Sequence, residues 1–418
     1  YSVPELKWYG TCNELNGAYA ADGYSKKSGK LGVLVTTMGV GELSALNGIS
    51  GSFAEYVPIL SIVGTTPTMA KVQGLPSHHV ITKIDPLTKT DHYVYQKMAA
   101  NISCNVTSIE DPFEAPNMVD ALIHDILKEK KPGYLYLPCN LASTLVSDSN
   151  LRTRSGKSFY EKTKCDNQQM IGKLASKILD QLYLSHRPLL LSDCLVDRLH
   201  LSCQVQKFVD MAKIPNSCTQ MGKSTLNEQS SYYVGDYTGN ETSKNTLNYV
   251  SSCDLMIHVG NFDNETNSGH FSIHKGFEDQ ISGKTLILLN HKYIKIGSKL
   301  FYGYSVQDVL PRMLQMLDIS RIPQIPAPSI QNTIPSVRSS TPISETDILK
   351  EIQNFLKPND TLVIDTGSIL YGLSDIRLPA GCKVLTQPFY LSIGMGLPCS
   401  FGASVALSLI HISEPTRH

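Results

Sequence analysis

Short apolar runs alternate with helical stretches along most of this chain, and this alternation limits the folds that it can adopt. The runs LGVLVTTMG (31–39), VPILSIVGTT (57–66) and GYLYLPCN (133–140) have the length and residue types of strands, and GELSALNGISGSFAEY (41–56) between the first two is helical. Strands that are apolar on both faces and separated by helices indicate a parallel sheet covered on both sides. The sequence therefore predicts an α/β fold.

The same pattern restarts twice. PLLLSDCLVD (188–197), CDLMIHVGNFD (253–263) and KTLILLNHKYI (284–294) are predicted strands of a second unit. The segment 322–344 is rich in Pro and Ser and has no period, which is typical of an extended linker. After it, SETDILKEIQNFLKPNDTLVIDTGS (344–368) predicts an N-capped helix, a turn and the first strand of a third unit.

We therefore expect three parallel-sheet α/β units, since 418 residues exceed one ordinary core. The third unit is too short to close its own core. LIHISEPTRH at the end of the chain breaks the preceding helix pattern, and we expect it to be a non-native tail. The expected boundaries are 1–150, 165–321, 322–344 for the linker, 345–408 and 409–418 for the tail.

Composition excludes several classes of partner. Lys plus Arg equals Asp plus Glu at 37 each, so no net field draws the chain to nucleic acid or to an anionic membrane. No apolar run approaches the ~20 residues of a membrane helix. Ten cysteines without a CxxC pair indicate reduced thiols in a cytoplasmic protein. The chain opens on Tyr1 and not on Met, so we expect that its N-terminal segment, with any targeting signal, is missing.

Glu14 is the single acid at the start of a helix of small residues, GTCNELNGAYAADGYSKK (10–27). One interpretation is a carboxylate that complements the helix dipole, worth less than ~1 kcal/mol, and composition alone favours it. The other is functional, because the small side chains let another surface approach. An acid packed there loses water, its pKa rises, and it can share a proton with a ligand nitrogen.

Two glycine turns resemble phosphate loops without matching them. Gly39 and Gly41 precede a helix, but there is no third glycine at dinucleotide spacing, and Glu42 in the first turn would repel a phosphate. Close packing of the helix on the sheet explains these glycines better. MGKSTLNE (221–228) contains Gly-Lys-Ser, but position 217, where the loop needs its first glycine, is Ser.

His78 and His79 are adjacent in a predicted loop after a strand. A lone loop histidine is usually solvated, whereas two in sequence offer proton transfer near neutral pH. No other ligand accompanies them at metal-binding spacing, so proton transfer is the sharper hypothesis.

These blocks together resemble the thiamine diphosphate-dependent 2-oxo acid decarboxylases, the pyruvate decarboxylase family. The resemblance covers Tyr1 to about Leu407 and is most specific in its first blocks. Within the family, SDCLVDR, NETNSGHF and TQPFYLSIGMGLP are closest to the fungal phenylpyruvate or transaminated amino acid decarboxylases. The blocks that carry it are GTCNELNGAYAADGYS, VTTMGVGELSALNGISGSFAE, the histidine pair, MGKSTLNE and LSIGMGLP.

The resemblance implies an activity and a site. The activity is non-oxidative decarboxylation of a 2-oxo acid, aromatic or branched in preference to pyruvate, to an aldehyde and CO2 through a thiamine diphosphate ylide. It implies that Glu14 hydrogen-bonds N1' of the aminopyrimidine and that His78 and His79 handle protons. Ile393 would be an apolar wedge under the cofactor, although a core residue is the alternative. Further residues implied to line the aminopyrimidine pocket are Thr366, Gly367, Leu391 and Ser392.

The resemblance also implies what this sequence lacks and what it assembles with. The family's active-site Gly-Asp-Phe segment is expected before Tyr1, and its Mg²⁺ ligands are expected after residue 418, so the fragment should be inactive alone. Cofactor binding between subunits implies a homodimer or homotetramer. A thiamine diphosphate-sensing regulatory homologue that binds a transcription factor remains an alternative, and a carboligase resembling acetolactate synthase is disfavoured by the histidine pair.

Overall fold

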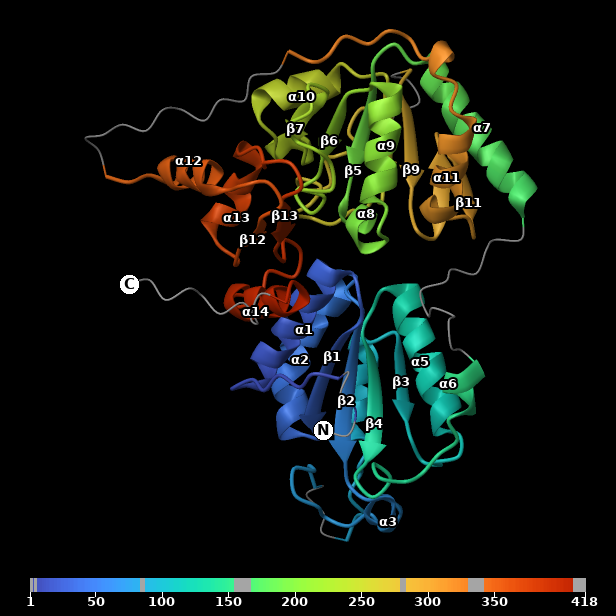
Figure 1. Cartoon of the computed structure of the whole chain (residues 1–418), viewed down its shortest axis with the longest axis vertical. Helices are drawn as coiled ribbons and strands as arrows, with labels where there is room; N and C mark the ends of the chain where they lie inside the picture. Colours follow the sequence, from blue (N-terminus) through green and yellow to red (C-terminus); the bar gives the residue numbers. More distant parts are fainter. Residues whose placement is uncertain are drawn as a thin grey trace. The chain divides into compact units, whose positions relative to one another are not determined.

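The computed structural model describes residues 3, 6–82, 87–153, 167–278, 283–329 and 342–408. They form two compact units, which are described separately: unit 1 is Tyr1–Lys162 with Tyr390–His418, and unit 2 is Thr163–Phe389. Figure 1 traces both. The helices and the parallel strand pairs confirm the α/β class. The three expected domain boundaries stay predictions, and the expected tail 409–418 lies outside the described residues.

Unit 1 contains a four-stranded parallel sheet in the order β1-β2-β4-β3. One face packs on the first two helices through Ala18, Ala45 and Ile49, and the opposite face packs on α5 through Leu122 and Ile126 (Figure 1). The strands are β1 (Gly32–Thr37), β2 (Ile59–Thr65), β3 (Asn105–Ser108) and β4 (Gly133–Pro138). The helices are α1 (Glu14–Ser28), α2 (Val40–Ala54), α3 (Thr68–Gln73), α4 (Val94–Ala99), η1 (Ala100–Ile102), α5 (Ala115–Glu129), α6 (Ser149–Thr153) and α14 (Gly396–Ala406).

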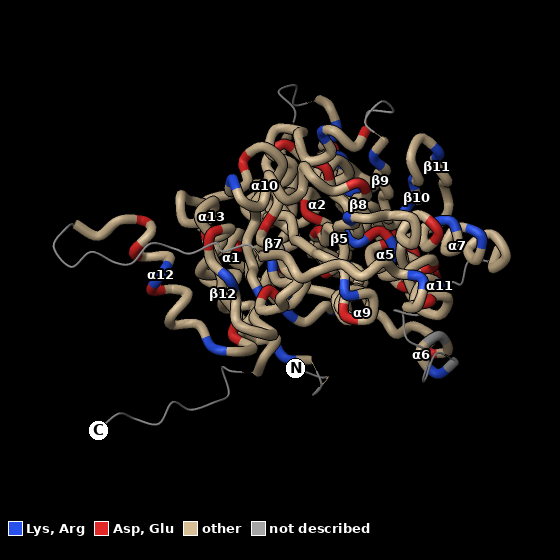
Figure 2. The backbone as a smooth tube through the Cα atoms, turned by 90° about the horizontal axis from the view of Figure 1, so that it is seen from above, with Lys and Arg blue, Asp and Glu red and all other residues tan. Residues whose placement is uncertain are grey.

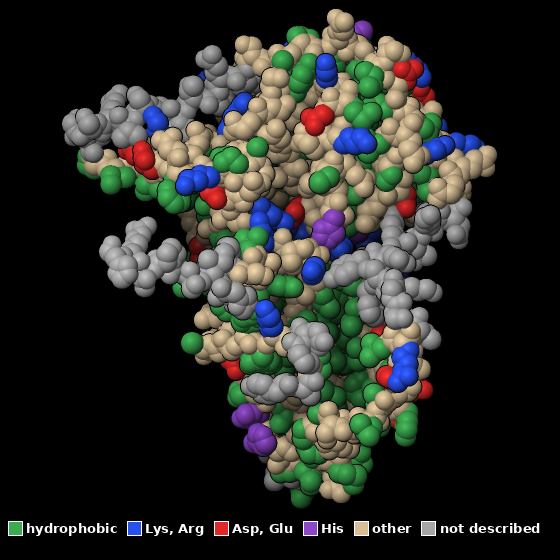
Figure 3. Space-filling view, viewed as in Figure 1, with side chains coloured by type: hydrophobic (Ala, Val, Ile, Leu, Met, Phe, Trp, Pro, Cys, Tyr) green, Lys and Arg blue, Asp and Glu red, His purple; other side chains and the backbone are tan. Residues whose placement is uncertain are grey.

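The first strand is less buried than the sequence predicts. β1 is an edge strand, and its residues alternate between buried and exposed. Val33 and Val35 are 52% and 44% exposed. Figure 3 shows apolar side chains at the surface of this unit. The prediction that this strand is covered on both faces is therefore wrong for the described residues, because one half of its side chains reaches the surface.

Small residues bring the first helix of unit 1 into backbone contact with α14. A Cβ added to Gly23 would lie 2.1 Å from the carbonyl oxygen of Cys399. A Cβ added to Gly402 would lie 1.8 Å from the carbonyl oxygen of Ala20. Neither position has room for a side chain, so the alanines and glycines of α1 serve close helix packing.

Unit 2 is built on a seven-stranded sheet in the order β11-β10-β9-β8-β5-β6-β7. Strands β5 to β9 run parallel, and the last two are antiparallel. The strands are β5 (Pro188–Ser192), β6 (Asn216–Cys218), β7 (Tyr233–Asp236), β8 (Leu255–Val259), β9 (Thr285–Leu289), β10 (Tyr293–Ile296) and β11 (Lys299–Tyr302). The helices of this part are α7 (Gln168–Leu184), α8 (Cys194–Arg198), α9 (Ser202–Ala212), η2 (Gly239–Glu241), α10 (Lys244–Ser251), α11 (Val306–Met316) and η3 (Ile319–Arg321).

The predicted strand 284–294 is two strands in the structure. β9 ends at Leu289. The side-chain oxygen of the next residue, Asn290, accepts a hydrogen bond from Lys292 N at 3.1 Å. An Asn side chain that binds the backbone two residues on makes a turn. The chain therefore reverses at Asn290 into the antiparallel β10, which apolar patterning alone did not show.

The start of the predicted third unit packs within unit 2. α12 (Glu345–Phe355) is capped by Ser344, whose hydroxyl accepts from Asp347 N, and this confirms the N-capped helix read from the sequence. β12 (Thr361–Val363) and β13 (Lys383–Leu385) pair in parallel. The remaining helices are α13 (Ser368–Gly372) and η4 (Leu373–Asp375).

Lys223 of the glycine-lysine segment is a buried structural cation. Its Nζ lies 3.0 Å from Glu228 and 2.8 Å from Asp236, and all three side chains are 1% exposed. It also donates to the carbonyl oxygen of Ile376 at 3.0 Å, and Leu378 N donates to Glu228 at 3.0 Å. The lysine thus ties the segment before β13 to the sheet, which supports the rejection of a nucleotide site.

Charges of both signs are interspersed along the described backbone (Figure 2). This agrees with the equal totals of acidic and basic residues. Among the described residues, no helix combines the length and the apolar character that crossing a membrane requires.

Substitution Gly402→Ala should lower the free energy of unfolding by about 1–3 kcal/mol, because the new methyl group has to displace backbone of α1. Gly172→Ala in α7 is the matched control. Its nearest neighbour is a side-chain atom 3.8 Å away, so the better helix propensity of Ala should stabilise by about 1 kcal/mol. Urea unfolding followed by far-UV circular dichroism measures both. Equal effects of the two substitutions would contradict the close packing.

The free energy of unfolding of unit 2 should fall as pH rises, because Asp236 loses its proton. Burial raises the pKa of Asp236 to about 7, although Lys223 pulls it down. Folding therefore favours the protonated acid. This contribution is complete below the unfolded pKa of about 4 and is lost as pH rises through about 7, with a slope of at most about 1.4 kcal/mol per pH unit.

Urea unfolding at pH 5 to 8 should show this slope in the unchanged chain and a flatter profile in Asp236→Asn. Asp210→Asn, which neutralises an exposed aspartate of the same unit, should keep the slope. An unchanged slope in Asp236→Asn would assign the pH dependence to another group.

Candidate active site

The turn between β1 and α2 is shaped by Gly39. Its φ of +63° with a ψ of −101° is a conformation that glycine adopts far more readily than residues with a side chain. A Cβ there would lie 2.2 Å from the carbonyl oxygen of His79. Only glycine fits this position, and what approaches it is the backbone of the histidine loop. The glycines therefore serve close packing, as the sequence favoured.

The carboxyl group of Glu42 lies at the amino end of α2. The carboxylate of Glu42 accepts from Gly39 N at 2.8 Å and from the hydroxyl of Tyr136 at 2.8 Å. Burial raises the pKa of Glu42, against the opposing effect of these hydrogen bonds. A buried carboxyl group already occupies the helix terminus, so the structure supports the rejection of a phosphate loop.

Glu14 lies beside this turn. It begins α1, where Asn13 caps the helix by accepting from Leu15 N at 2.8 Å. Its Oε1 lies 3.4 Å from the position that a Cβ on Gly41 would take, which is van der Waals contact. Glu14 is half-buried, not fully desolvated as the functional hypothesis expected. In the part of the chain that the structure describes, no hydrogen bond or ion pair engages its carboxylate.

Other acids of the same unit are paired. Asp22 and Glu55 both contact Lys26, at 2.9 and 3.3 Å, and all three side chains are at most 1% exposed. The hydroxyl of Ser52 also donates to Asp22 at 2.8 Å. These acids are structural, and Glu14 differs from them because its carboxylate stays available for a ligand.

His78 and His79 follow α3 in an exposed loop. Their rings meet edge to face with centroids 4.8 Å apart. His79 has a φ of +65°, which is uncommon for a residue with a side chain, and the hydroxyl of Tyr95 donates to its carbonyl oxygen at 2.9 Å. This bond and the contact with Gly39 hold the histidine loop against the turn that Glu14 also borders.

The segment before α14 supplies three more predicted residues to unit 1. Tyr390 N donates to Glu55 Oε1 at 3.2 Å, and its hydroxyl donates to Asn47 at 3.0 Å. Leu391 follows with a φ of +58°, a strained conformation for a bulky residue. Ser392 is half-buried, and Ile393 is 80% exposed. Ile393 is therefore not a core residue of the described chain, and its role as an apolar wedge stays a prediction.

Thr366 and Gly367 belong to unit 2. They follow β12, and Thr366 N donates to the Asp365 carboxylate at 2.7 Å. Among the described residues other than its two chain neighbours, no atom lies within 4 Å of the position that a Cβ on Gly367 would take. Their placement beside the unit 1 residues stays a prediction.

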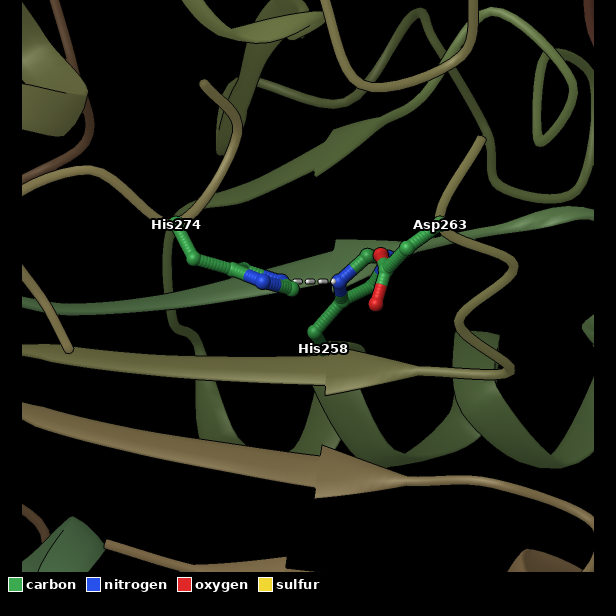
Figure 4. Close-up of side chains that lie close together, drawn as sticks. All are labelled: His258, Asp263 and His274. Carbon is green, nitrogen blue, oxygen red and sulfur yellow. Dashed lines mark hydrogen bonds between the residues drawn. The ribbon is translucent and has the colours of Figure 1, made fainter. Parts of the chain in front are cut away.

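A second cluster of chemically capable side chains lies in unit 2, and the sequence analysis missed it. His258 Nδ1 is 2.9 Å from His274 Nε2 (Figure 4). His258 Nε2 is 3.1 Å from the buried Asp193. Burial lowers the pKa of His274 to about 3, and the neighbouring His258 acts in the same direction. The only signal in the sequence was a histidine inside an apolar strand, LMIHV, which propensity does not explain.

Comparison with known proteins identifies both units. Residues 1–87 match the N-terminal TPP binding domain of thiamine pyrophosphate enzymes, and residues 175–317 match their central domain. The chain is 34% identical to a transaminated amino acid decarboxylase of Saccharomyces cerevisiae, over 96% of this chain and 66% of that protein.

Two further relatives from the same yeast are informative. Pyruvate decarboxylase isozyme 3 is 32% identical over 97% of this chain and 69% of that protein. The thiamine metabolism regulatory protein THI3 is 30% identical over 100% of this chain and 66% of that protein. The chain thus spans about two thirds of the length of these relatives.

Substitution Gly39→Ala should loosen the histidine loop, because a Cβ meets the carbonyl oxygen of His79 and disfavours the positive φ. Hydrogen exchange of residues 74–82 should become faster. Gly64→Ala, at the end of β2 with its nearest neighbour 3.8 Å away, is the control and should leave exchange in this loop unchanged. Unchanged exchange in Gly39→Ala would show that the contact does not hold the loop.

Proposed function

Because the chain belongs to the pyruvate decarboxylase family of thiamine pyrophosphate enzymes, we propose that the full-length protein decarboxylates 2-oxo acids to aldehydes and CO2 with thiamine diphosphate. The observation that carries the proposal is the half-buried carboxylate of Glu14, which is unpaired within the described chain, whereas Asp22 and Glu55 of the same unit are paired with Lys26. Aromatic or branched 2-oxo acids are the proposed substrates in preference to pyruvate. The 34% identity to a transaminated amino acid decarboxylase supports this choice.

The residues of unit 1 fit the aminopyrimidine half of the cofactor. A ring nitrogen that accepts a proton needs a carboxyl group with a free oxygen, and Glu14 offers one. A flat ring also needs apolar contact, and the exposed Ile393, after the strained Leu391, offers it. When bound, thiamine diphosphate supplies a carbon nucleophile and an electron sink for the departing CO2.

Glu14 is proposed to hold a proton between its carboxyl oxygen and N1' of the ring. Glu14 begins α1 and is half-buried, so a ring placed against it would exclude further water from its carboxyl group.

His78 and His79 are proposed to position the substrate carboxylate and to exchange protons with substrate and product. Both rings are exposed on a loop whose backbone is held by Gly39 and Tyr95. A histidine held in reach of a reacting group typically contributes ~10²–10⁴ in rate. The contacts that hold the backbone of this loop at His79 support the proposal.

The remaining parts of the proposal rest on the family. They are a homodimer or homotetramer with the cofactor at the subunit interface, a cytoplasmic location, and Mg²⁺ held by residues that follow position 418 in the longer protein. Thr366, Gly367 and Ser392 are proposed to complete the aminopyrimidine pocket. The 418-residue chain is proposed to be inactive by itself.

A regulatory protein is the second candidate. The relative named as a thiamine metabolism regulatory protein is 30% identical over 100% of this chain. Under this alternative the full-length protein binds thiamine diphosphate and releases no aldehyde.

Aldehyde release by the full-length protein from pyruvate, phenylpyruvate and 4-methyl-2-oxopentanoate tests the proposal. Substitution Glu14→Gln should lower kcat at least about 100-fold, because Gln cannot share the proton. Glu114→Gln, the same change at an exposed acid of unit 1, is the control and should keep full activity.

Calorimetric binding of thiamine diphosphate separates the outcomes. Binding without aldehyde from any of the three acids would favour the regulatory candidate. Full activity of Glu14→Gln would contradict the role assigned to Glu14.

A further inference from the structure

The sheet of unit 2 has a topological switch point between β5 and β8. These strands are neighbours, but the chain leaves β5 toward β6 and β7 on one side and leaves β8 toward β9 on the other. In open α/β sheets, ligands bind where such connections diverge, at the carboxyl ends of the strands. Asp193 directly follows β5, and His258 lies near the end of β8, so both stand at this point.

Asp193 is a fully buried anion that fixes the orientation of His258. Its Oδ1 accepts from Cys194 N at 2.6 Å, from the Thr219 hydroxyl at 2.7 Å and from Asn267 Nδ2 at 2.9 Å. Its Oδ2 accepts from Phe262 N at 2.8 Å and lies 3.1 Å from His258 Nε2. The hydrogen bonds assign the proton of His258 to Nε2, so the lone pair of Nδ1 points away from Asp193. A carboxylate behind a histidine is the usual support of a metal-binding imidazole.

The free Nδ1 of His258 faces His274, and Asp263 lies nearby. His258 Nδ1 is 2.9 Å from His274 Nε2 (Figure 4). Either His274 donates a proton across this distance, or two lone pairs face each other and a cation belongs between them. One ligand atom from each of His258, His274 and Asp263 lies within 4.8 Å of the other two. Asp263 is exposed, so an ion can reach the site from solvent.

We propose that His258, His274 and Asp263 bind a divalent transition-metal ion of the Zn²⁺ class, with Asp193 orienting His258. Two imidazoles and one carboxylate suit zinc, whereas Mg²⁺ prefers oxygen ligands. Tetrahedral zinc sets ligand atoms about 3.3 Å apart. The two histidine nitrogens have to separate by about 0.4 Å, and Asp263 has to approach by up to about 1.5 Å, which an exposed side chain can do.

The site has the composition of an open zinc centre. Three protein ligands leave the fourth position to water or to a small ligand, unlike structural zinc sites, which have four protein ligands. The ion would join the end of β8 to the loop that carries Asp263 and His274. Binding to the folded chain alone should therefore stabilise unit 2.

Titration of the EDTA-treated full chain with Co²⁺ tests the proposal. We expect one Co²⁺ per chain, with the visible absorption of a four-coordinate ion, and its displacement by Zn²⁺. Substitution Asp263→Asn removes an exposed ligand without disturbing the core and should weaken binding at least about 10-fold, as should His274→Gln. Neither thiamine diphosphate nor a 2-oxo acid is present, so the result is independent of the proposed function.

His270→Gln is the matched control. His270 lies in the same loop as His274, but it is 70% exposed and pairs with Glu241 and Glu265. The His270→Gln chain should bind Co²⁺ with the same affinity as the unchanged chain. Absence of the four-coordinate spectrum in the unchanged chain would overturn the proposal, as would undiminished binding by Asp263→Asn and His274→Gln. Circular dichroism verifies that His274→Gln is folded.

Discussion

A carboxylate taken out of water needs a hydrogen-bond donor or a cation beside it, and the buried acids of unit 1 meet this requirement. Asp22 and Glu55 share Lys26, and Glu42 accepts from Gly39 and Tyr136. Glu14 stands at the edge of this network, half-buried and without such a partner in the described chain. The network joins the helices around Glu14 and does not include its carboxylate.

Close backbone contacts determine which segments of unit 1 pack near Glu14. Gly23 and Gly402 let α14 approach α1, and this places the segment with Ile393 in unit 1. The absence of a side chain at Gly39 leaves room for the carbonyl oxygen of His79, and this close contact holds the histidine loop at the turn beside Glu14. The small residues thus set the packing of the segments that carry the proposed site residues, and substituting them should disturb that packing.

The sequence predicted most of this fold because apolar strands and capped helices have local signals. The strands at 32–37, 59–65 and 133–138 and the helix capped by Ser344 are confirmed. β3, with the residues NVTS, is short and polar, and the turn at Asn290 depends on one side-chain hydrogen bond. Such features have no period to detect. The cluster of His258 and His274 arises only when the end of β8 meets a distant loop, so local patterns could not reveal it.

The central claim is that Glu14 shares a proton with the aminopyrimidine and so activates the bound cofactor. The exchange of the C2 proton of thiamine diphosphate with D2O, followed by NMR on the full-length protein, tests this most directly. The account predicts exchange much faster than in free cofactor, and a loss of at least about 100-fold in Glu14→Gln with the cofactor still bound. Equally fast exchange in both proteins would contradict it.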